Sequence, residues 1–132
     1  MAKFNLEINN LTSNRVDKKF LKKFAEKVLK SIKLKIPELS IGFVSSSRMK
    51  SLNRKYRGRN RITDVLAFDY GEIIICLSQA KKQARNLEHS LRDELTILLI
   101  HGILHLAGYD DKTKSGYNKM LNKQKEIWQK II

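Results

Sequence analysis

The segment from Leu91 to Ala107 restricts the fold more than any other part of the chain, because it is apolar on every side. Its apolar side chains do not keep to one stripe of a helix: Leu91, Leu95, Ile97, Leu98, Leu99, Ile100, Ile103, Leu104 and Leu106. Ser90 is suited to cap the first turn, with Asp93 at the third helical position. Gly108 is suited to end the helix in a left-handed conformation. A helix of this kind is buried inside a domain, so we expect the other elements to pack around it.

The segments before this helix predict a mixed sheet. Alternating apolar residues indicate a strand at 4–8, and an amphipathic helix at about 20–32 precedes a second strand at 39–44. This order favours a parallel crossover. Strands at 65–68 and 73–77 are separated only by Asp69-Tyr70-Gly71 and should form an antiparallel hairpin. The run 73–77 is apolar on both faces, which is typical of an inner strand.

Helical patterns complete the set of elements. We expect helices at about 49–56, at about 78–86 with Ser78 as N-cap, and at about 114–131. A chain of 132 residues is the size of one domain with one core. The predicted fold is therefore a single small domain over residues 1–132 of the α/β (α+β) class. It has a four-stranded mixed sheet, about five helices and the all-apolar helix at its centre.

The charge of the chain points to polyanionic partners. Lys and Arg number 27 against 13 Asp and Glu, a formal net charge of +14. Such a balance favours RNA, DNA or an anionic membrane surface, and we favour nucleic acid. No apolar stretch reaches the roughly 18 residues of a membrane span, and the N-terminal segment lacks the apolar core of a signal peptide. One cysteine, Cys76, excludes an internal disulfide framework. We therefore expect a cytoplasmic protein without a membrane partner.

Two histidines on the central helix indicate a metal site. His101 and His105 are four residues apart and project from one helix face. Paired imidazoles suit zinc or a similar divalent ion. The turn at Gly108 lets a later carboxylate, Asp110 or Asp111, return as a third ligand, with water completing the coordination. The alternative is a pair of structural histidines, which is costly to bury unless each finds a partner, so we favour the metal.

The residue after the first histidine bears on the reaction. Zinc peptidases place a glutamate there as general base, whereas this chain has Gly102. A bound ion can still activate water by lowering its pKa. His89 lies outside the pattern, in a polar stretch, and is predicted to be a surface residue.

Basic residues are concentrated between positions 48 and 61, and no acidic residue occurs between Glu38 and Asp64. Arginine forks match phosphate oxygens, and Tyr56 offers a stacking face. Most of these side chains are expected simply to be solvated, but one arginine facing the metal would bind phosphate and offset charge in the transition state. The basic residues of this segment are Arg48, Lys50, Arg54, Lys55, Arg57, Arg59 and Arg61.

Two motifs resemble the YbeY family of bacterial metal-dependent endoribonucleases. Residues 101–111, HGILHLAGYDD, are similar to the family pattern H-G-x-L-H-L-x-G-Y-D-H. Residues 52–68, LNRKYRGRNRITDVLAF, are similar to L-N-x-x-Y-R-G-x-x-x-x-T-D-V-L-S-F. Gly71-Glu72-Ile73 occupies the place of the family's G-D-I. The resemblance extends over most of the chain after residue 38.

The resemblance implies a function and a site. The family acts in ribosomal RNA maturation, notably at the 3′ end of the small-subunit RNA, and in ribosome quality control. Its zinc-type ion is held by three histidines, of which the first two correspond to His101 and His105, and its conserved arginine corresponds to Arg57. Asp111 replaces the third histidine. A carboxylate is a competent zinc ligand, but its charge weakens the Lewis acid and suits harder ions such as manganese or magnesium.

Three hypotheses follow. The first is a single-strand-specific endoribonuclease. It binds one divalent ion, for which zinc is favoured, on His101, His105 and Asp111. In it, Arg57 steadies the phosphate, and either activated water or the ribose 2′-OH attacks. Because so small a protein has little surface for reading bases, a protein partner is expected to select the cleavage site. The second is a non-catalytic ribosome assembly factor, favoured by the Asp111 replacement, and the third is another hydrolase, such as a peptidase. The candidate RNA-binding residues are Arg54, Lys55, Arg59 and Arg61.

Overall fold

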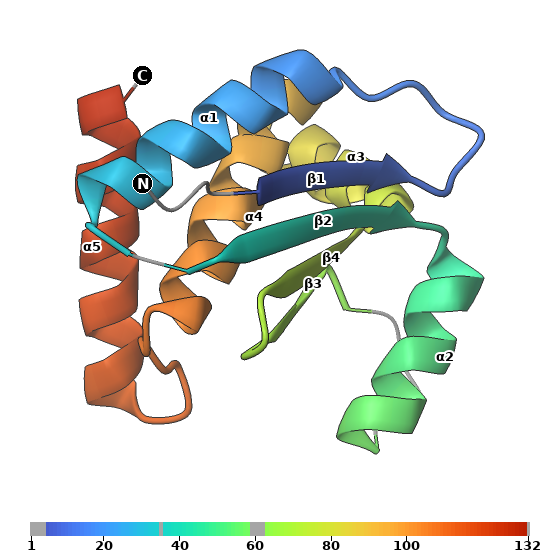
Figure 1. Ribbon diagram of the computed structural model, residues 1–132. Helices are drawn as coiled ribbons and strands as arrows, with labels where there is room; N and C mark the ends of the chain where they lie inside the picture. Colours follow the sequence, from blue (N-terminus) through green and yellow to red (C-terminus); the bar gives the residue numbers. More distant parts are fainter. Residues whose placement is uncertain (1–4, 35, 59–62, 132) are drawn as a thin grey trace.

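A four-stranded mixed sheet forms the middle of the molecule in the computed structural model, which describes residues 5–34, 36–58 and 63–131 (Figure 1). The strands are β1 (Asn5–Asn10), β2 (Glu38–Val44), β3 (Val65–Phe68) and β4 (Glu72–Cys76). The helices found in these ranges are α1 (Lys18–Ser31), α2 (Ser46–Arg57), α3 (Leu77–Asn86), α4 (Leu91–Leu106) and α5 (Lys114–Ile131). The predicted fold class, with a mixed sheet and five helices, is confirmed.

The strand order is β1-β2-β4-β3. β1 and β2 run parallel, as the predicted crossover requires, and β2 also runs parallel to β4. β3 and β4 form the predicted antiparallel hairpin, which leaves β4 as an inner strand and β3 at the edge. The hairpin turn needs glycine: Gly71 has φ +105°, and a Cβ there would lie 2.6 Å from the Glu38 carbonyl oxygen.

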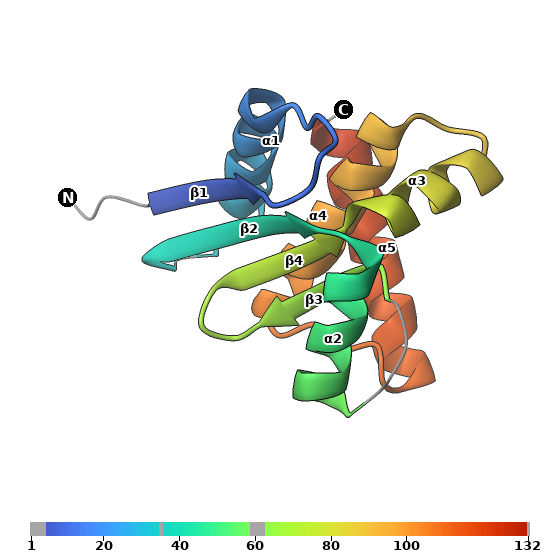
Figure 2. The same ribbon diagram turned by 90° about the vertical axis from the view of Figure 1, so that its right-hand side faces the viewer.

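The two faces of the sheet are covered unequally. α2 covers one face near β3 and β4, whereas the other helices gather on the opposite face (Figure 2). α4 lies in the middle of that larger layer, in contact with α1, α3, α5 and the β3–β4 hairpin. Its central position, predicted from the apolar pattern, is confirmed. No helix in the described ranges is long and apolar enough to cross a membrane.

The ends of α4 follow the predicted capping chemistry. The Ser90 hydroxyl accepts a hydrogen bond from the Asp93 amide at 3.0 Å. At the other end Gly108 has φ +99°, and its amide donates to the His105 carbonyl at 3.1 Å. The Tyr109 amide reaches back to the Leu104 carbonyl at 3.0 Å. These two bonds form a Schellman motif, which reverses the chain immediately after the histidine pair.

Two helices begin earlier than predicted, and Leu77, predicted to end a strand, is the first residue of α3. Ser78 does not cap α3, because it lies inside the helix, which begins at Leu77 and has its N-cap position at Cys76. The Ser78 hydroxyl instead lies 3.4 Å from the Cys76 sulfur. α2 begins at Ser46 rather than near residue 49, since the Ser45 hydroxyl caps it by accepting from the Arg48 amide at 3.3 Å. Residues 73–77 form an uninterrupted apolar run, so the sequence pattern does not show where β4 ends and α3 begins.

Candidate metal centre

The last two turns of α4 bring the two predicted histidines together. The Nε2 atoms of His101 and His105 lie 3.1 Å apart, with ring centroids 4.7 Å apart. The two side chains are 27% and 30% exposed, so they line the protein surface rather than its core. The rest of this part of the helix is packed in the core, since Gly102, Ile103 and Leu104 between the two histidines are buried.

The turn after α4 returns one carboxylate to the histidine pair. Asp111 Oδ2 lies 3.9 Å from His101 Nε2 and 3.8 Å from His105 Nε2. Asp110 is occupied elsewhere, because its Oδ1 accepts a hydrogen bond from the Lys112 amide at 2.8 Å. Of the two carboxylates that the sequence left open, the fold therefore brings Asp111 to the histidines.

The spacing of these three side chains fits a divalent ion. One ligand atom from each lies within 4.8 Å of the others. Tetrahedral zinc, with ligands at 2.0–2.2 Å, requires ligand atoms about 3.3 Å apart. The separations of 3.1, 3.8 and 3.9 Å are close to this value. Two imidazoles and one carboxylate leave a coordination position for water, which is the composition of an open catalytic site.

Both rings are oriented by further hydrogen bonds. His101 Nδ1 lies 3.4 Å from the Gln124 side-chain oxygen on α5, while its Nε2 faces the His105 ring. The His105 ring has a backbone hydrogen bond at Tyr109. Burial, and then the neighbouring His101, lower the pKa of His105 despite the nearby Asp111 carboxylate. A lowered pKa keeps the ring neutral, which is the form that binds a metal.

A glycine on α5 sets the position of the turn that carries Asp111. A Cβ at Gly116 would overlap the Asp110 carbonyl oxygen and would lie 3.0 Å from the Thr113 hydroxyl. The turn can therefore approach α5 only when residue 116 lacks a side chain. Sequence reasoning gave Gly116 no role, because the close approach depends on a contact between two segments.

Gly116→Ala is expected to weaken divalent metal binding by about tenfold or more, since it displaces the turn beside Asp111. Helix content should not fall, because alanine favours a helix interior. Titration of the metal-free protein with zinc against a chromophoric chelator measures the change. Gly42→Ala is the matched control, as a Cβ there meets nothing within 4 Å. Equal zinc affinities for the two variants would contradict the assignment.

Gly102 explains why this site lacks the base of a zinc peptidase. The residue is buried, and a Cβ there would lie 2.9 Å from Ile73 Cγ2 on β4. Position 102 thus faces the sheet, where a glutamate would clash instead of reaching the metal centre. The peptidase hypothesis has no general base at the expected position.

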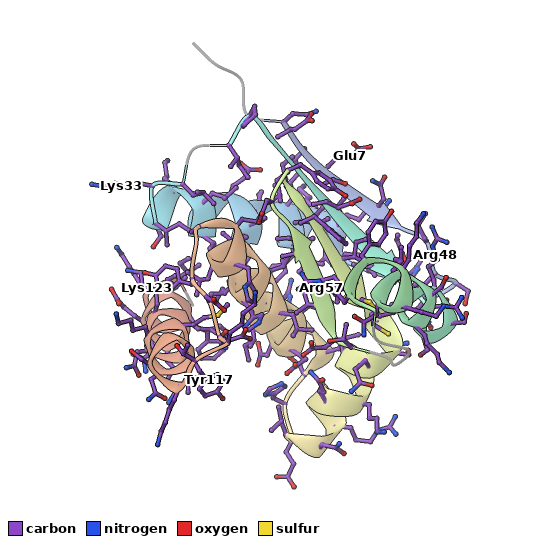
Figure 3. The ribbon with its side chains drawn as sticks, turned by 90° about the horizontal axis from the view of Figure 1, so that it is seen from below. Glu7, Lys33, Arg48, Arg57, Tyr117 and Lys123 are labelled. Carbon is purple, nitrogen blue, oxygen red and sulfur yellow. The ribbon has the colours of Figure 1, made fainter. Side chains whose placement is uncertain are left out.

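Arg57 ends α2 beside the metal centre. Its Nη2 donates a hydrogen bond to the Ala67 carbonyl oxygen at 3.2 Å, which holds the side chain against the edge strand β3. Its charge contributes to the lowered pKa of His105. In Figure 3 Arg57 lies toward the middle of the molecule, whereas Arg48 lies at the outer side of α2. The predicted arginine therefore lies on the side of the molecule that bears the histidines, within electrostatic range of His105.

The other basic residues are only partly placed. Arg54 and Lys55 are exposed in the last turn of α2, one turn or less from Arg57. Arg59 and Arg61 lie outside the residues that the structure describes. The exposed pair adds positive charge to the side of the molecule where Arg57 meets β3.

A buried carboxylate was missed by sequence reasoning. Glu94 on α4 is 3% exposed, and its Oε2 accepts from Gln83 Nε2 at 2.8 Å. His89 was predicted to be a surface residue, but its ring is half-buried and its Nε2 lies 2.6 Å from Glu94 Oε1. Gln83 also donates to Asp64 Oδ2 at 3.3 Å. This network ties α3 and the chain before β3 to α4. The available signal was a carboxylate that shares a helix face with Leu91 and Leu98.

The chain is an α/β protein in which a small mixed sheet packs against a central helix. Two histidines near the end of this helix form part of a candidate divalent-metal centre. The family model described as endoribonuclease YbeY matches residues 7–132. The chain belongs to this enzyme family, as the two sequence motifs predicted.

Known proteins with similar sequences, and a solved structure with a similar fold, support this family assignment. An endoribonuclease YbeY of Sulfurihydrogenibium sp. is 38% identical, over 90% of this chain and 86% of that protein. Another, of Persephonella marina, is 37% identical over 92% and 88% of the two chains. The solution structure of TM1509 from Thermotoga maritima has a TM-score of 0.63 at 31% identity, covering 95% of this chain and 90% of that chain.

Proposed function

We propose that this protein is a metal-dependent endoribonuclease that cuts single-stranded RNA. One divalent ion is held by His101, His105 and Asp111, and zinc is the ion that we expect there. The observation that carries the proposal is the juxtaposition of this three-ligand group with Arg57. A site for a hydrolytic ion and a donor for phosphate are the two parts that phosphodiester cleavage needs. The matched relatives carry the name endoribonuclease, which gives RNA as the substrate.

Each side chain has a distinct task in this proposal. When bound, the ion supplies a Lewis acid that lowers the pKa of water. His101 and His105 offer ring nitrogens from the central helix, and Asp111 contributes a carboxylate from the turn. Arg57 directs its guanidinium donors at the phosphate and offsets the charge that builds up in the transition state. This arrangement serves attack by water and attack by the ribose 2′-OH equally.

Ribosomal RNA is the substrate we propose, at the 3′ end of the small-subunit RNA and in ribosome quality control, within the cytoplasm. The family resemblance and the net charge of +14 support this assignment. Arg54, Lys55, Arg59 and Arg61 are the proposed RNA contacts. A protein partner of the small subunit selects the cleavage site. Accurate cleavage of naked ribosomal RNA by the purified protein would argue against such a partner.

Arg57→Ala is expected to reduce the cleavage rate of single-stranded RNA by about a hundredfold, since the phosphate loses its guanidinium donor. Arg57→Lys should recover only part of the rate, because an ammonium lacks the planar fork. Arg48→Ala, an exposed arginine at the other end of the same helix, is the matched control and should stay within about twofold. Timed cleavage of a labelled oligonucleotide, with and without chelator, measures each rate.

The non-catalytic ribosome factor is the second candidate, because Asp111 departs from the three-histidine pattern. It predicts RNA binding without cleavage at any metal concentration. Equal cleavage by wild type and Arg57→Ala, or cleavage that persists in chelator, would contradict the endoribonuclease proposal.

A further inference from the structure

Three aromatic rings form a row that begins beside Arg57. Tyr56 of α2 meets Phe68 of β3 edge to face, with centroids 5.3 Å apart and an interplanar angle of 74°. Phe68 then stacks on Tyr70 of the hairpin turn, at 5.7 Å and 18°. We call Tyr56, Phe68 and Tyr70 the aromatic row. Its two ends are open to solvent, as Tyr56 is 54% and Tyr70 is 73% exposed.

The aromatic row is held in a defined position. Phe68 packs against the core cluster between α2 and the sheet, so the middle ring is anchored to the fold. The Tyr70 hydroxyl donates to Glu72 Oε1 at 2.6 Å, and this hydrogen bond raises the pKa of Tyr70 to about 12. The ring therefore stays neutral at physiological pH. Rigid and uncharged aromatic faces stack on a ligand at a low entropic cost.

The aromatic row is connected to the metal centre through Arg57. Phe68 follows Ala67, whose carbonyl oxygen accepts the hydrogen bond from Arg57. Arg57 in turn acts electrostatically on His105. A strand of RNA with a phosphate at Arg57 would thus have its next bases at the aromatic row.

The charges around the aromatic row fit nucleic acid. Lys55 Nζ lies 5.2 Å from the centroid of the Tyr56 ring, so a cation accompanies the end nearest Arg57. Asp69 and Glu72 lie at the Tyr70 end, which disfavours phosphate there. The sugar-phosphate chain is therefore expected to run past Arg57 and Lys55 while bases turn toward the rings. Aromatic faces interleaved with cations are typical of single-strand binding sites.

We propose that the aromatic row is a stacking platform for unpaired bases of the RNA substrate, next to the phosphate that is cut. This inference rests on the proposed endoribonuclease function and adds the basis of its preference for single strands. Bases inside a duplex keep their faces covered by neighbouring bases and cannot stack on the rings. Because every base has a π-face, the platform tolerates different sequences.

Binding of a fluorescein-labelled single-stranded RNA of mixed sequence, followed by anisotropy in the presence of chelator, tests the platform without cleavage. Tyr70→Ala and Tyr56→Ala are each expected to weaken binding by roughly five- to thirtyfold. Tyr70→Phe, which keeps the ring and loses the bond to Glu72, should bind within about twofold of wild type. Tyr117→Ala, an equally accessible tyrosine on α5, across α4 from Arg57, is the matched control (Figure 3).

Two further ligands separate stacking from charge. An RNA of equal length with abasic residues keeps its phosphates, so wild type and Tyr70→Ala should bind it equally. A duplex of the same sequence should show the same equality. Wild-type affinity for the single strand in both alanine variants would overturn the proposal, as would an equal loss for the abasic strand. Failure of the proposed endoribonuclease function would give a different result. The wild-type protein would not cleave RNA, but the tyrosine substitutions would still weaken RNA binding.

Discussion

We expect the wild-type protein to carry roughly one divalent ion per chain, and His105→Ala and Asp111→Ala are each expected to lose it. Each change removes one of three candidate ligand atoms that lie 3.1–3.9 Å apart, and two remaining ligands would not hold zinc against a chelating buffer. RNA cleavage should fall with the ion, by about a thousandfold. Elemental analysis of the purified variants, beside timed cleavage, checks both parts.

Neighbouring substitutions sharpen this metal prediction. Asp110→Ala should retain the ion, because the Asp110 carboxylate faces the Lys112 amide. Asp111→His restores the family's three-histidine set and should retain one ion, with a stronger preference for zinc over manganese. A full complement of ion in Asp111→Ala would remove this carboxylate from the site. Wild type without any ion after reconstitution would favour the non-catalytic ribosome factor.

Glu94→Ala is expected to lower the free energy of unfolding by about 3 kcal/mol. The carboxylate is buried, and its loss leaves the half-buried His89 ring and the Gln83 amide without their partner. For a domain of this size the melting temperature should fall by about 10 °C. Thermal unfolding followed by circular dichroism, with urea unfolding as a second measure, gives the change.

The neighbouring carboxylate provides the control for this stability prediction. Asp93 is in the same first turn of α4 but is less buried than Glu94. Asp93→Ala should cost under about 1 kcal/mol, mainly through the helix dipole. Glu94→Gln keeps the shape and one acceptor, so its cost should lie between the two alanine variants. Similar melting temperatures for Glu94→Ala and Asp93→Ala would contradict a structural role for the network.

Local patterns predicted the elements that carry the site. The apolar residues on all sides of α4 required a central helix, and the spacing of His101 and His105 required that both point from one face. Gly108 predicted the reversal that returns a carboxylate. These features depend on residues within a few positions of one another, so periodicity and capping chemistry are enough to find them.

Features that depend on distant segments were not predictable in the same way. The choice of Asp111 over Asp110 depends on how the turn settles against Gly116 of α5. Gln124 reaches His101 from the same helix, and a polar residue between Met120 and Ile127 on the inward face was the only signal. The contact between Glu94 and His89 depends on the turn between α3 and α4, whose polar composition alone predicts exposed residues. Packing, rather than local preference, decides each of these.

The docking of the C-terminal helix has a thermodynamic consequence. The turn that bears Asp111 rests on Gly116, and His101 lies beside Gln124, so two of the three candidate ligands are positioned through α5. An ion that needs all three ligands binds the docked arrangement in preference to any form in which α5 has separated. By linkage, such an ion would stabilise that docking in proportion to the logarithm of its free concentration. The docking of the C-terminal helix and the binding of metal would thus be coupled equilibria.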